Sequence, residues 1–143
     1  MIIKQISVFV ENKLGKLAEI MNALHKNDIN IRALSIADTK DFGILRLIVN
    51  DPEKAEAVLK ESDYAVSITR VIAIVVEDRP GALAKAMNIL TENGISVEYM
   101  YAFITRSENE AYVVIRVEDN QKAVDVLTGR GIRILKSEEA YNF

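Results

Sequence analysis

Residues 77–96 read EDRPGALAKAMNILTENGIS, and residues 11–30 read ENKLGKLAEIMNALHKNDIN. The two stretches lie 66 positions apart, and nine of their twenty positions are identical. Similarity at a fixed spacing indicates that the chain contains one structural unit twice. Each copy begins with a loop that ends in glycine, NKLG or DRPG, and continues into a segment with apolar residues at helical spacing.

The hydrophobic pattern around each copy predicts the order β-α-β-β-α-β. In the first copy, the predicted strands cover 2–10, 28–37 (beginning near Asn30), 44–49 and 64–68, and helices begin after Gly15 and at Asp51-Pro52. In the second copy, the predicted strands cover 71–76, 97–105, 111–117 and 132–135, and helices cover 82–92 and Asp119 to Leu127. This order is the ferredoxin-like unit, one antiparallel sheet with two helices on one face.

The fold class is therefore predicted as α+β, with two tandem ferredoxin-like βαββαβ units over residues 1–68 and 69–143. No Gly, Pro, Asn or Asp occurs from Tyr64 to Val76, so we expect the last strand of the first copy to run directly into the next strand. A strand of this length spans roughly 40 Å and would pass from one sheet to the other. The pattern leaves open whether the fourth strand pairs with its own copy or is exchanged.

The composition and the absence of known motifs argue against several classes of protein. The chain has 143 residues, a net charge of −3 and no cysteine, and it lacks a basic stripe or a long apolar run. We expect a cytoplasmic protein that binds neither nucleic acid nor a membrane. No P-loop, HExxH, GxSxG or Cys/His ligand cluster occurs. The sequence therefore predicts no enzyme activity, no cofactor and no metal site.

The loop before the first helix of each copy has the properties of an anion site. The first N–H groups of a helix lack partners within it, and the helix dipole adds partial positive charge, so a carboxylate or phosphate is favoured there. Lys13 or Arg79 would add positive charge. Asn12 or Asp78 either caps the helix or receives the amino group of a zwitterion. The other reading is a capped helix with a tight turn and nothing bound.

At these residues the sequence resembles the ACT domain, a ferredoxin-like regulatory module that binds amino acids. The segment EDRPGALA followed by NGISV carries the resemblance, and ENKLGKLA followed by NDINI is similar, with Leu14 in place of proline. The stretch VEYMYAF over 97–103 is similar to the second strand of small proteins built from two ACT domains. The resemblance covers the entire chain.

The resemblance implies ligand pockets where ACT modules meet, with the loop of one module facing the second strand of another. The implied ligand-binding residues are Asn12, Lys13, Leu14, Gly15, Asp78, Arg79, Pro80 and Gly81 in the loops, and Asn30 and Ser96 at the strand starts. Ser96 is shorter than the asparagine usual in the family. The two pockets are therefore expected to differ.

Two features bear on packing and partners. Tyr99, Tyr101 and Phe103 alternate along one strand face, which fits either a wall for a ligand or partner or aromatic residues that pack on a sheet. The strand over 71–76 is apolar on both faces and needs a second cover besides the helices. The other copy or another chain would supply this cover, and we expect a homo-oligomer, most simply a dimer, unless the two copies cover each other face to face.

Two function classes follow. The first is a sensor that binds an amino acid and passes the signal to an enzyme or operon. The second is a regulatory subunit that acts by protein contact on a metabolic enzyme, similar to the small subunit of acetolactate synthase, which carries an ACT module. A thermal-shift screen against the amino acids separates the two.

The pattern predicts which pocket binds more tightly. The pocket that combines Asp78, Arg79 and Gly81 with Asn30, across the two copies or two chains, has both the complete loop motif and the longer amide side chain. Asp78→Ala and Asn30→Ala should each weaken binding by about ten- to a hundredfold, because a hydrogen bond to a charged group contributes roughly 1.5–3 kcal/mol. Asn12→Ala and Ser96→Ala should matter less. Calorimetry with the amino acid found by the screen measures all four, and equal losses would indicate two equivalent sites.

Overall fold

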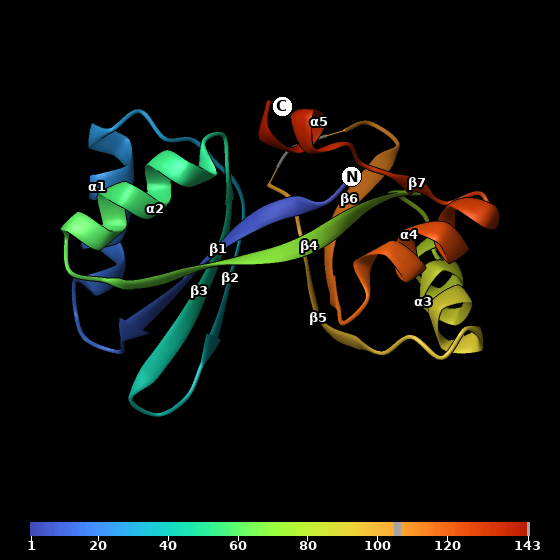
Figure 1. Ribbon diagram of the computed structural model, residues 1–143, viewed down its shortest axis with the longest axis horizontal. Coiled ribbons are helices and arrows are strands. Elements are labelled where there is room, and N and C mark those ends of the chain that lie inside the picture. The colour runs from blue at the N-terminus through green and yellow to red at the C-terminus, as the bar shows by residue number, and fades with distance from the viewer. Residues whose placement is uncertain (105–106, 143) are drawn as a thin grey trace.

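One strand, β4 (Ala65–Glu77), belongs to both halves of the molecule. It pairs antiparallel with β1 (Ile3–Glu11) as far as Val71, and from Ile72 it pairs with β6 (Glu110–Val117). The computed structural model describes residues 1–104 and 107–142, and it shows β4 crossing the centre of the molecule without a turn (Figure 1). The prediction of one continuous strand between two sheets is confirmed. The domain boundary expected at 68/69 falls within this strand.

The first half is a four-stranded antiparallel sheet in the order β2-β3-β1-β4. Its other elements are α1 (Lys16–Lys26), β2 (Ile31–Asp38), β3 (Phe42–Val49) and α2 (Pro52–Glu61). The fourth strand therefore pairs with the first strand of its own copy, which resolves the alternative that the sequence left open. Asp51 caps α2 as predicted, because its Oδ1 accepts a hydrogen bond from the Lys54 N–H at 3.1 Å.

The second half repeats this topology in the order β5-β6-β4-β7. Its other elements are α3 (Ala82–Glu92), β5 (Val97–Ala102), α4 (Asn120–Gly129) and β7 (Arg133–Ile134). Asp119 caps α4 by accepting from the Lys122 N–H at 3.0 Å, and the helix runs two residues beyond the predicted end at Leu127. The fold class predicted from the sequence is thus confirmed, with two ferredoxin-like units and antiparallel sheets.

Two elements differ from the prediction. The strand expected over 97–105 ends at Ala102, and Phe103 forms an isolated bridge with Ala33 of β2; position 105 lies outside the described residues. A short helix, α5 (Ser137–Tyr141), was not predicted. It has five residues, too few for an apolar period to appear in the sequence. Its packing on the first half decides its position, because the Tyr141 hydroxyl accepts from the Lys4 N–H at 2.8 Å.

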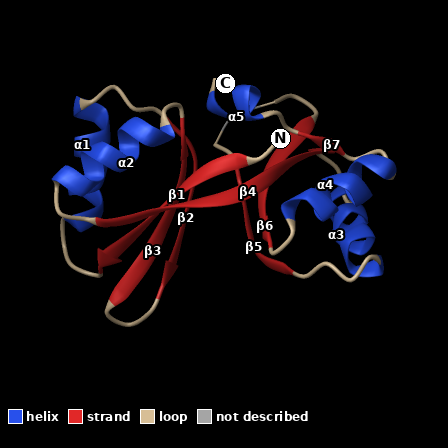
Figure 2. Cartoon of the chain, in the orientation of Figure 1, coloured by secondary structure: helices blue, strands red, loops and turns tan. Residues whose placement is uncertain are grey.

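Helices α1 and α2 lie on one outer side of the molecule and α3 and α4 on the other, whereas α5 lies near the centre, where the two sheets face each other (Figure 2). Each half has its own core between sheet and helices, and a third core fills the space between the sheets. Its buried residues are Ile3, Ala33, Ile48, Val71, Ala73, Val75, Phe103, Val114, Leu135 and Ala140. The helix-free face of β4 is therefore covered by the same chain.

This finding corrects the argument for a dimer. The apolar face of the strand over 71–76 requires no second chain, because Val71 and Ala73 are fully buried and Val75 is 6% exposed in a single chain. The copies cover each other face to face, the exception that the sequence allowed. Among the described residues, no helix is long and apolar enough to cross a membrane.

Candidate functional site

The two β–α loops have the same backbone hydrogen bonds, although only the glycine is identical between NKLG and DRPG. In the first copy, the Asn12 N–H donates to the carbonyl of Asp41 at 2.9 Å and the Lys13 N–H to that of Glu11 at 2.9 Å. In the second copy, Asp78 and Arg79 donate to the corresponding carbonyls at the same distances. The two halves therefore build the same loop structure from different residues.

A glycine in the left-handed region ends each loop and begins each helix. Gly15 has φ 87° and Gly81 has φ 89°, values that only glycine adopts without strain. In the described part of the chain, no side chain caps α1 or α3, so the expectation that Asn12 or Asp78 could cap the helix is wrong. The asparagine and aspartate side chains stay exposed beside uncapped N–H groups, which are available to a carboxylate.

The loop cations are already paired. Lys13 Nζ lies 2.7 Å from Glu11 Oε2, and Arg79 forms the corresponding ion pair with Glu77. The hydrogen bond from Lys13 lowers the pKa of the Glu11 carboxyl, and the one from Arg79 lowers the pKa of Glu77 in the same way. All four side chains are exposed, so water and salt weaken these pairs. The paired cations therefore add little positive charge to either loop, and the backbone N–H groups are the main attraction for an anion.

The loop of the first copy borders a shallow hollow of about 70 Å³. Asn12 and Lys13 line it together with Leu17, Ile36 and Asp38. Sequence reasoning missed Ile36 and Asp38. The signal for them was available, because the first and second strands of this fold run parallel and end at the same edge. The second copy has Ala102 and Ile104 at these two positions, so it lacks this carboxylate.

The other predicted residues lie apart within one chain. Ser96 lines a hollow of about 450 Å³ with Glu98 and Lys122, and Asp78 lines another of about 440 Å³ with Phe103 and Glu110. Arg79 borders a third, of about 120 Å³.

Asn30 borders none of these hollows in the described part of the chain. Its N–H donates to Asn50 Oδ1 at 2.8 Å. Leu14, Gly15, Pro80 and Gly81 are exposed in their loops. None of these hollows is lined by both Asp78 and Asn30, or by both Asn12 and Ser96.

The aromatic residues of β5 face the other sheet. Tyr101 Oη donates to Gln5 Oε1 at 2.6 Å, and Gln5 Nε2 donates to Tyr99 Oη at 2.9 Å. The Arg46 guanidinium lies 3.7 Å from the centre of the Tyr99 ring, a cation–π contact. Burial, followed by the neighbouring Tyr99, raises the pKa of Tyr101, so its hydroxyl stays protonated. Of the two readings of these side chains, packing between the sheets is the one that the structure supports.

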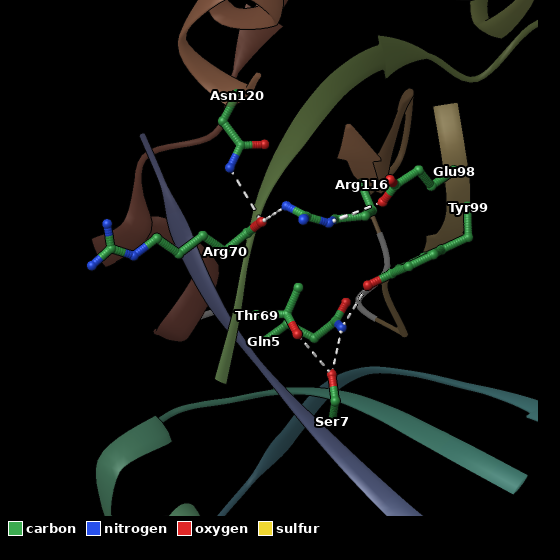
Figure 3. Close-up of polar contacts among 8 residues, drawn as sticks. All are labelled: Gln5, Ser7, Thr69, Arg70, Glu98, Tyr99, Arg116 and Asn120. Atoms are coloured by element: carbon green, nitrogen blue, oxygen red, sulfur yellow. Dashed lines mark hydrogen bonds and ion pairs between the residues drawn. The ribbon is translucent and has the colours of Figure 1, made fainter. Parts of the chain in front are cut away.

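The polar contacts continue beyond these aromatic residues. Gln5 is fully buried and also donates to Ser7 Oγ at 3.0 Å, and Ser7 Oγ lies 3.1 Å from Thr69 Oγ1 on β4 (Figure 3). A polar layer therefore lies beside the apolar core between the sheets. Among the described residues, no group of three or more His, Cys, Asp or Glu side chains is placed to hold a metal ion.

Comparison with known proteins agrees with this architecture. The family model described as "ACT domain pair" matches residues 1–142. The crystal structure of protein BT0572 from Bacteroides thetaiotaomicron is 43% identical, with a TM-score of 0.94, and the alignment covers 100% of this chain and 98% of that one. No protein with a curated description matches the sequence.

More distant structures share the fold. The regulatory subunit of aspartate kinase from Thermus thermophilus is 15% identical with a TM-score of 0.65, over 90% of this chain and 92% of that one. The structure of aspartokinase alpha and beta subunits is 20% identical with a TM-score of 0.56, over 90% and 95%. At these identities the likeness concerns the fold alone.

The loop glycine and a helix glycine should respond oppositely to alanine. Gly81→Ala places a Cβ at φ 89° and should lower the free energy of unfolding by about 1–2 kcal/mol, although a Cβ there meets no atom within 4 Å. Gly129→Ala, at the end of α4 and equally free of contacts, should leave stability unchanged or raise it by up to about 1 kcal/mol. Urea unfolding of both variants measures the difference. Equal effects would show that the left-handed conformation of the loop is not required.

Proposed function

Because the chain belongs to the family of ACT domain pairs, we propose that it is a non-catalytic regulatory protein that binds an amino acid where ACT modules meet. The observation that carries the proposal is the repeated loop, with the same hydrogen bonds and a left-handed glycine before an uncapped helix in both halves. The ligand's carboxylate would bind the free N–H groups of the helix. Its ammonium group would bind the exposed side chain of Asp78 or Asn12.

We place the complete pockets between two chains. In one chain, none of the hollows described above is lined by both Asp78 and Asn30, and the hollow beside Asn12 is small, about 70 Å³. A second chain that brings its β2 or β5 strand start to the loop would supply the missing wall and exclude water, which strengthens each polar contact. The pairings proposed are the loop of Asp78, Arg79, Pro80 and Gly81 with Asn30, and the loop of Asn12, Lys13, Leu14 and Gly15 with Ser96.

A second candidate function is that of a regulatory subunit that acts by contact with a metabolic enzyme. The observation in its favour is the likeness to the aspartate kinase regulatory subunit, which extends over nearly the whole of both chains. Under this alternative, the protein would act like the small subunit of acetolactate synthase. Its exposed apolar surfaces would bind the enzyme, and ligand binding would be secondary. Either function would be carried out in the cytoplasm.

A thermal-shift screen against the standard amino acids tests the first function. An amino acid present at one hundred times its Kd should stabilise the protein by about 2.7 kcal/mol and raise its Tm by several degrees. Gly81→Ala and Asp78→Ala should reduce the shift, because they alter the proposed site. If no amino acid raises the Tm, the sensor function fails. The subunit alternative then requires a co-purifying enzyme whose activity changes when the pure chain is added.

The proposed pockets require a homodimer, and the first sheet has an exposed apolar surface on which a second copy could pack. Phe9 of β1 and Phe42 of β3 lie on the helix-free face of the first sheet and are 54% and 53% exposed. Ala65, which pairs with Phe9, is also exposed. We call these three residues the aromatic patch. It continues the same sheet face that the second half covers near Val71, so it extends an interface that already exists.

In the second half, the corresponding helix-free face of the sheet is covered by the chain itself. Val75, the repeat counterpart of Phe9, is only 6% exposed because it belongs to the core that Leu135 and Ala140 complete. The first half has no counterpart of α5 among the described residues. Both signs of charge surround the patch, with Lys16 and Glu19 beside it. Mixed charges allow the patch to meet its own copy across a two-fold axis, because a two-fold contact uses the same surface twice.

Phe9→Asp should shift the protein from dimer to monomer, because it places a charge at the centre of the buried patch. Ile104→Asp is the matched control, since Ile104 is 58% exposed and lies outside the patch. Sedimentation velocity at several concentrations measures both. A dimer that is unaffected by Phe9→Asp, or a parent protein that is monomeric at micromolar concentration, contradicts the proposal.

A further inference from the structure

The backbone carbonyl of Arg70 lies where β4 changes partners. The ladder between β4 and β6 ends at Ile72 and Ile115, and Arg70 stands two residues outside it. Its carbonyl accepts a hydrogen bond from Arg116 Nη1 at 2.9 Å and another from Asn120 Nδ2 at 3.2 Å (Figure 3). Side chains of the second half therefore hold the backbone at the crossing, where Arg70 still pairs with Lys4 of β1 but the ladder with β6 has ended.

Arg116 also binds a carboxylate. Its Nε lies 3.1 Å from Glu98 Oε2 on β5 (Figure 3). The guanidinium group is planar, always charged and carries several donors in fixed directions, so it can hold Glu98 and the Arg70 carbonyl together. The Arg116 side chain is 27% exposed and that of Glu98 is 52% exposed. Glu98 thus orients Arg116 toward β4 and remains within reach of solvent.

Glu98 stands at a β-bulge. The register between β5 and β6 shifts between Val97 and Tyr99, and β2 has the same shift between Ile31 and Ala33. The repeat counterpart of Glu98 is therefore Arg32, whose Nε donates to the carbonyl of Tyr141 at 3.1 Å. Bulges redirect a side chain out of the ladder pattern. The Arg32 side chain joins the first half to α5 of the second half, whereas the Glu98 side chain stays within its own half and orients Arg116, which reaches β4 at Arg70.

The next residue of β5 holds β4 from the inside. Tyr99 accepts from Gln5, Gln5 donates to Ser7, and Ser7 contacts Thr69, the neighbour of Arg70. Consecutive residues of β5 are thus connected to consecutive residues of β4 by two routes. The outer route runs through Arg116 and the inner route through Gln5 and Ser7. We call the two routes the junction clamp.

We propose that the junction clamp sets the angle between the two sheets and that Glu98 is the residue of the clamp that can be displaced, by losing its contact with Arg116. The inner route is buried around Gln5, whereas Glu98 is half-exposed. Without Glu98 to orient it, Arg116 would hold the Arg70 carbonyl less firmly, and Asn120 contributes only a longer hydrogen bond between neutral groups. Release would therefore loosen the angle between the halves without unfolding either half.

The position of Glu98 shows how a ligand could release it. Glu98 lines the same hollow of about 450 Å³ as Ser96. A cationic group that binds the Glu98 carboxylate there competes with Arg116. Where this group is the ammonium group of a bound amino acid, the inference rests on the proposed function. The clamp itself does not depend on that function.

Distance measurements between two spin labels test the clamp. The chain has no cysteine, so Ala57→Cys on α2 and Asp125→Cys on α4, both exposed positions, give one labelled site in each half. Pulsed EPR on the doubly labelled full chain, mixed with an excess of unlabelled chain so that a dimer carries labels on one copy only, should give a single narrow distance distribution. Glu98→Gln keeps the shape of the side chain but removes its charge, and it should shift or broaden this distribution. Arg116→Ala should do so more strongly.

Glu92→Gln is the matched control. It breaks the exposed Arg130–Glu92 pair, which has the same 3.1 Å separation but connects the ends of α4 and α3 and not β4, and it should leave the distribution unchanged. Thermal melts of each variant separate loosening from unfolding, and Glu98→Gln decides the outcome if Arg116→Ala does not fold. Distributions for Glu98→Gln and Arg116→Ala that match the parent would overturn the proposal.

Each standard amino acid is then added to the labelled parent and to its Glu98→Gln variant. An amino acid that raises the Tm should shift the parent's distribution toward that of Glu98→Gln and change the variant little. Equal shifts in both proteins would overturn release through Glu98. If no amino acid changes the Tm, the proposed function fails, whereas the comparison of variants without ligand still decides whether the clamp exists.

Discussion

The structure depends on the backbone of β4, which is the edge strand of the first sheet and a central strand of the second. Hydrogen bonds to β1 occupy its first part, and those to β6 and β7 occupy its last part, so both edges of the later part are paired. Unpaired backbone groups in a buried strand are costly, and this pairing therefore fixes the strand on both sides. With no turn between the two parts, neither half can move far without bending the strand that it shares with the other.

The space between the sheets combines an apolar core with a polar layer, and these contribute differently. Burial of apolar side chains such as Ile48 and Val71 stabilises the contact but depends little on direction. The hydrogen bonds of Gln5 depend on direction, and a buried polar group left without a partner costs about 1–3 kcal/mol. The polar layer therefore favours one relative arrangement of the sheets among those that the apolar core would allow.

The two loops share a backbone and differ in their surroundings. The hollow of the first copy includes the carboxylate of Asp38, and the second copy has Ile104 at that position. Loop cations are neutralised by Glu11 and Glu77 in both halves. Any difference in what the loops bind therefore comes from side chains, those of the loop itself, such as Asp78 in place of Asn12, and those around it, because the backbone hydrogen bonds of the two loops are equivalent.

Local patterns in the sequence specified the secondary structure. The repeat, the caps at Asp51 and Asp119, and the absence of turn residues before Val76 each act within a few residues of the chain, so they could be read directly. The left-handed conformation of the loop glycines is also determined locally, since the loop before each helix requires it. The five-residue helix α5 was missed because it has no period of its own and depends on contacts with Lys4 and Arg32, far away in the sequence.

The relation between the two halves was decided only by the tertiary structure. The alternation of Tyr99, Tyr101 and Phe103 showed that they share a face, but only the packing shows that this face meets Gln5 of the other half. In the same way, the apolar strand over 71–76 indicated that a second cover was needed without showing that its own chain provides it. Periodicity reports which residues are buried together along one element. What buries them depends on contacts between residues distant in sequence, which no local pattern records.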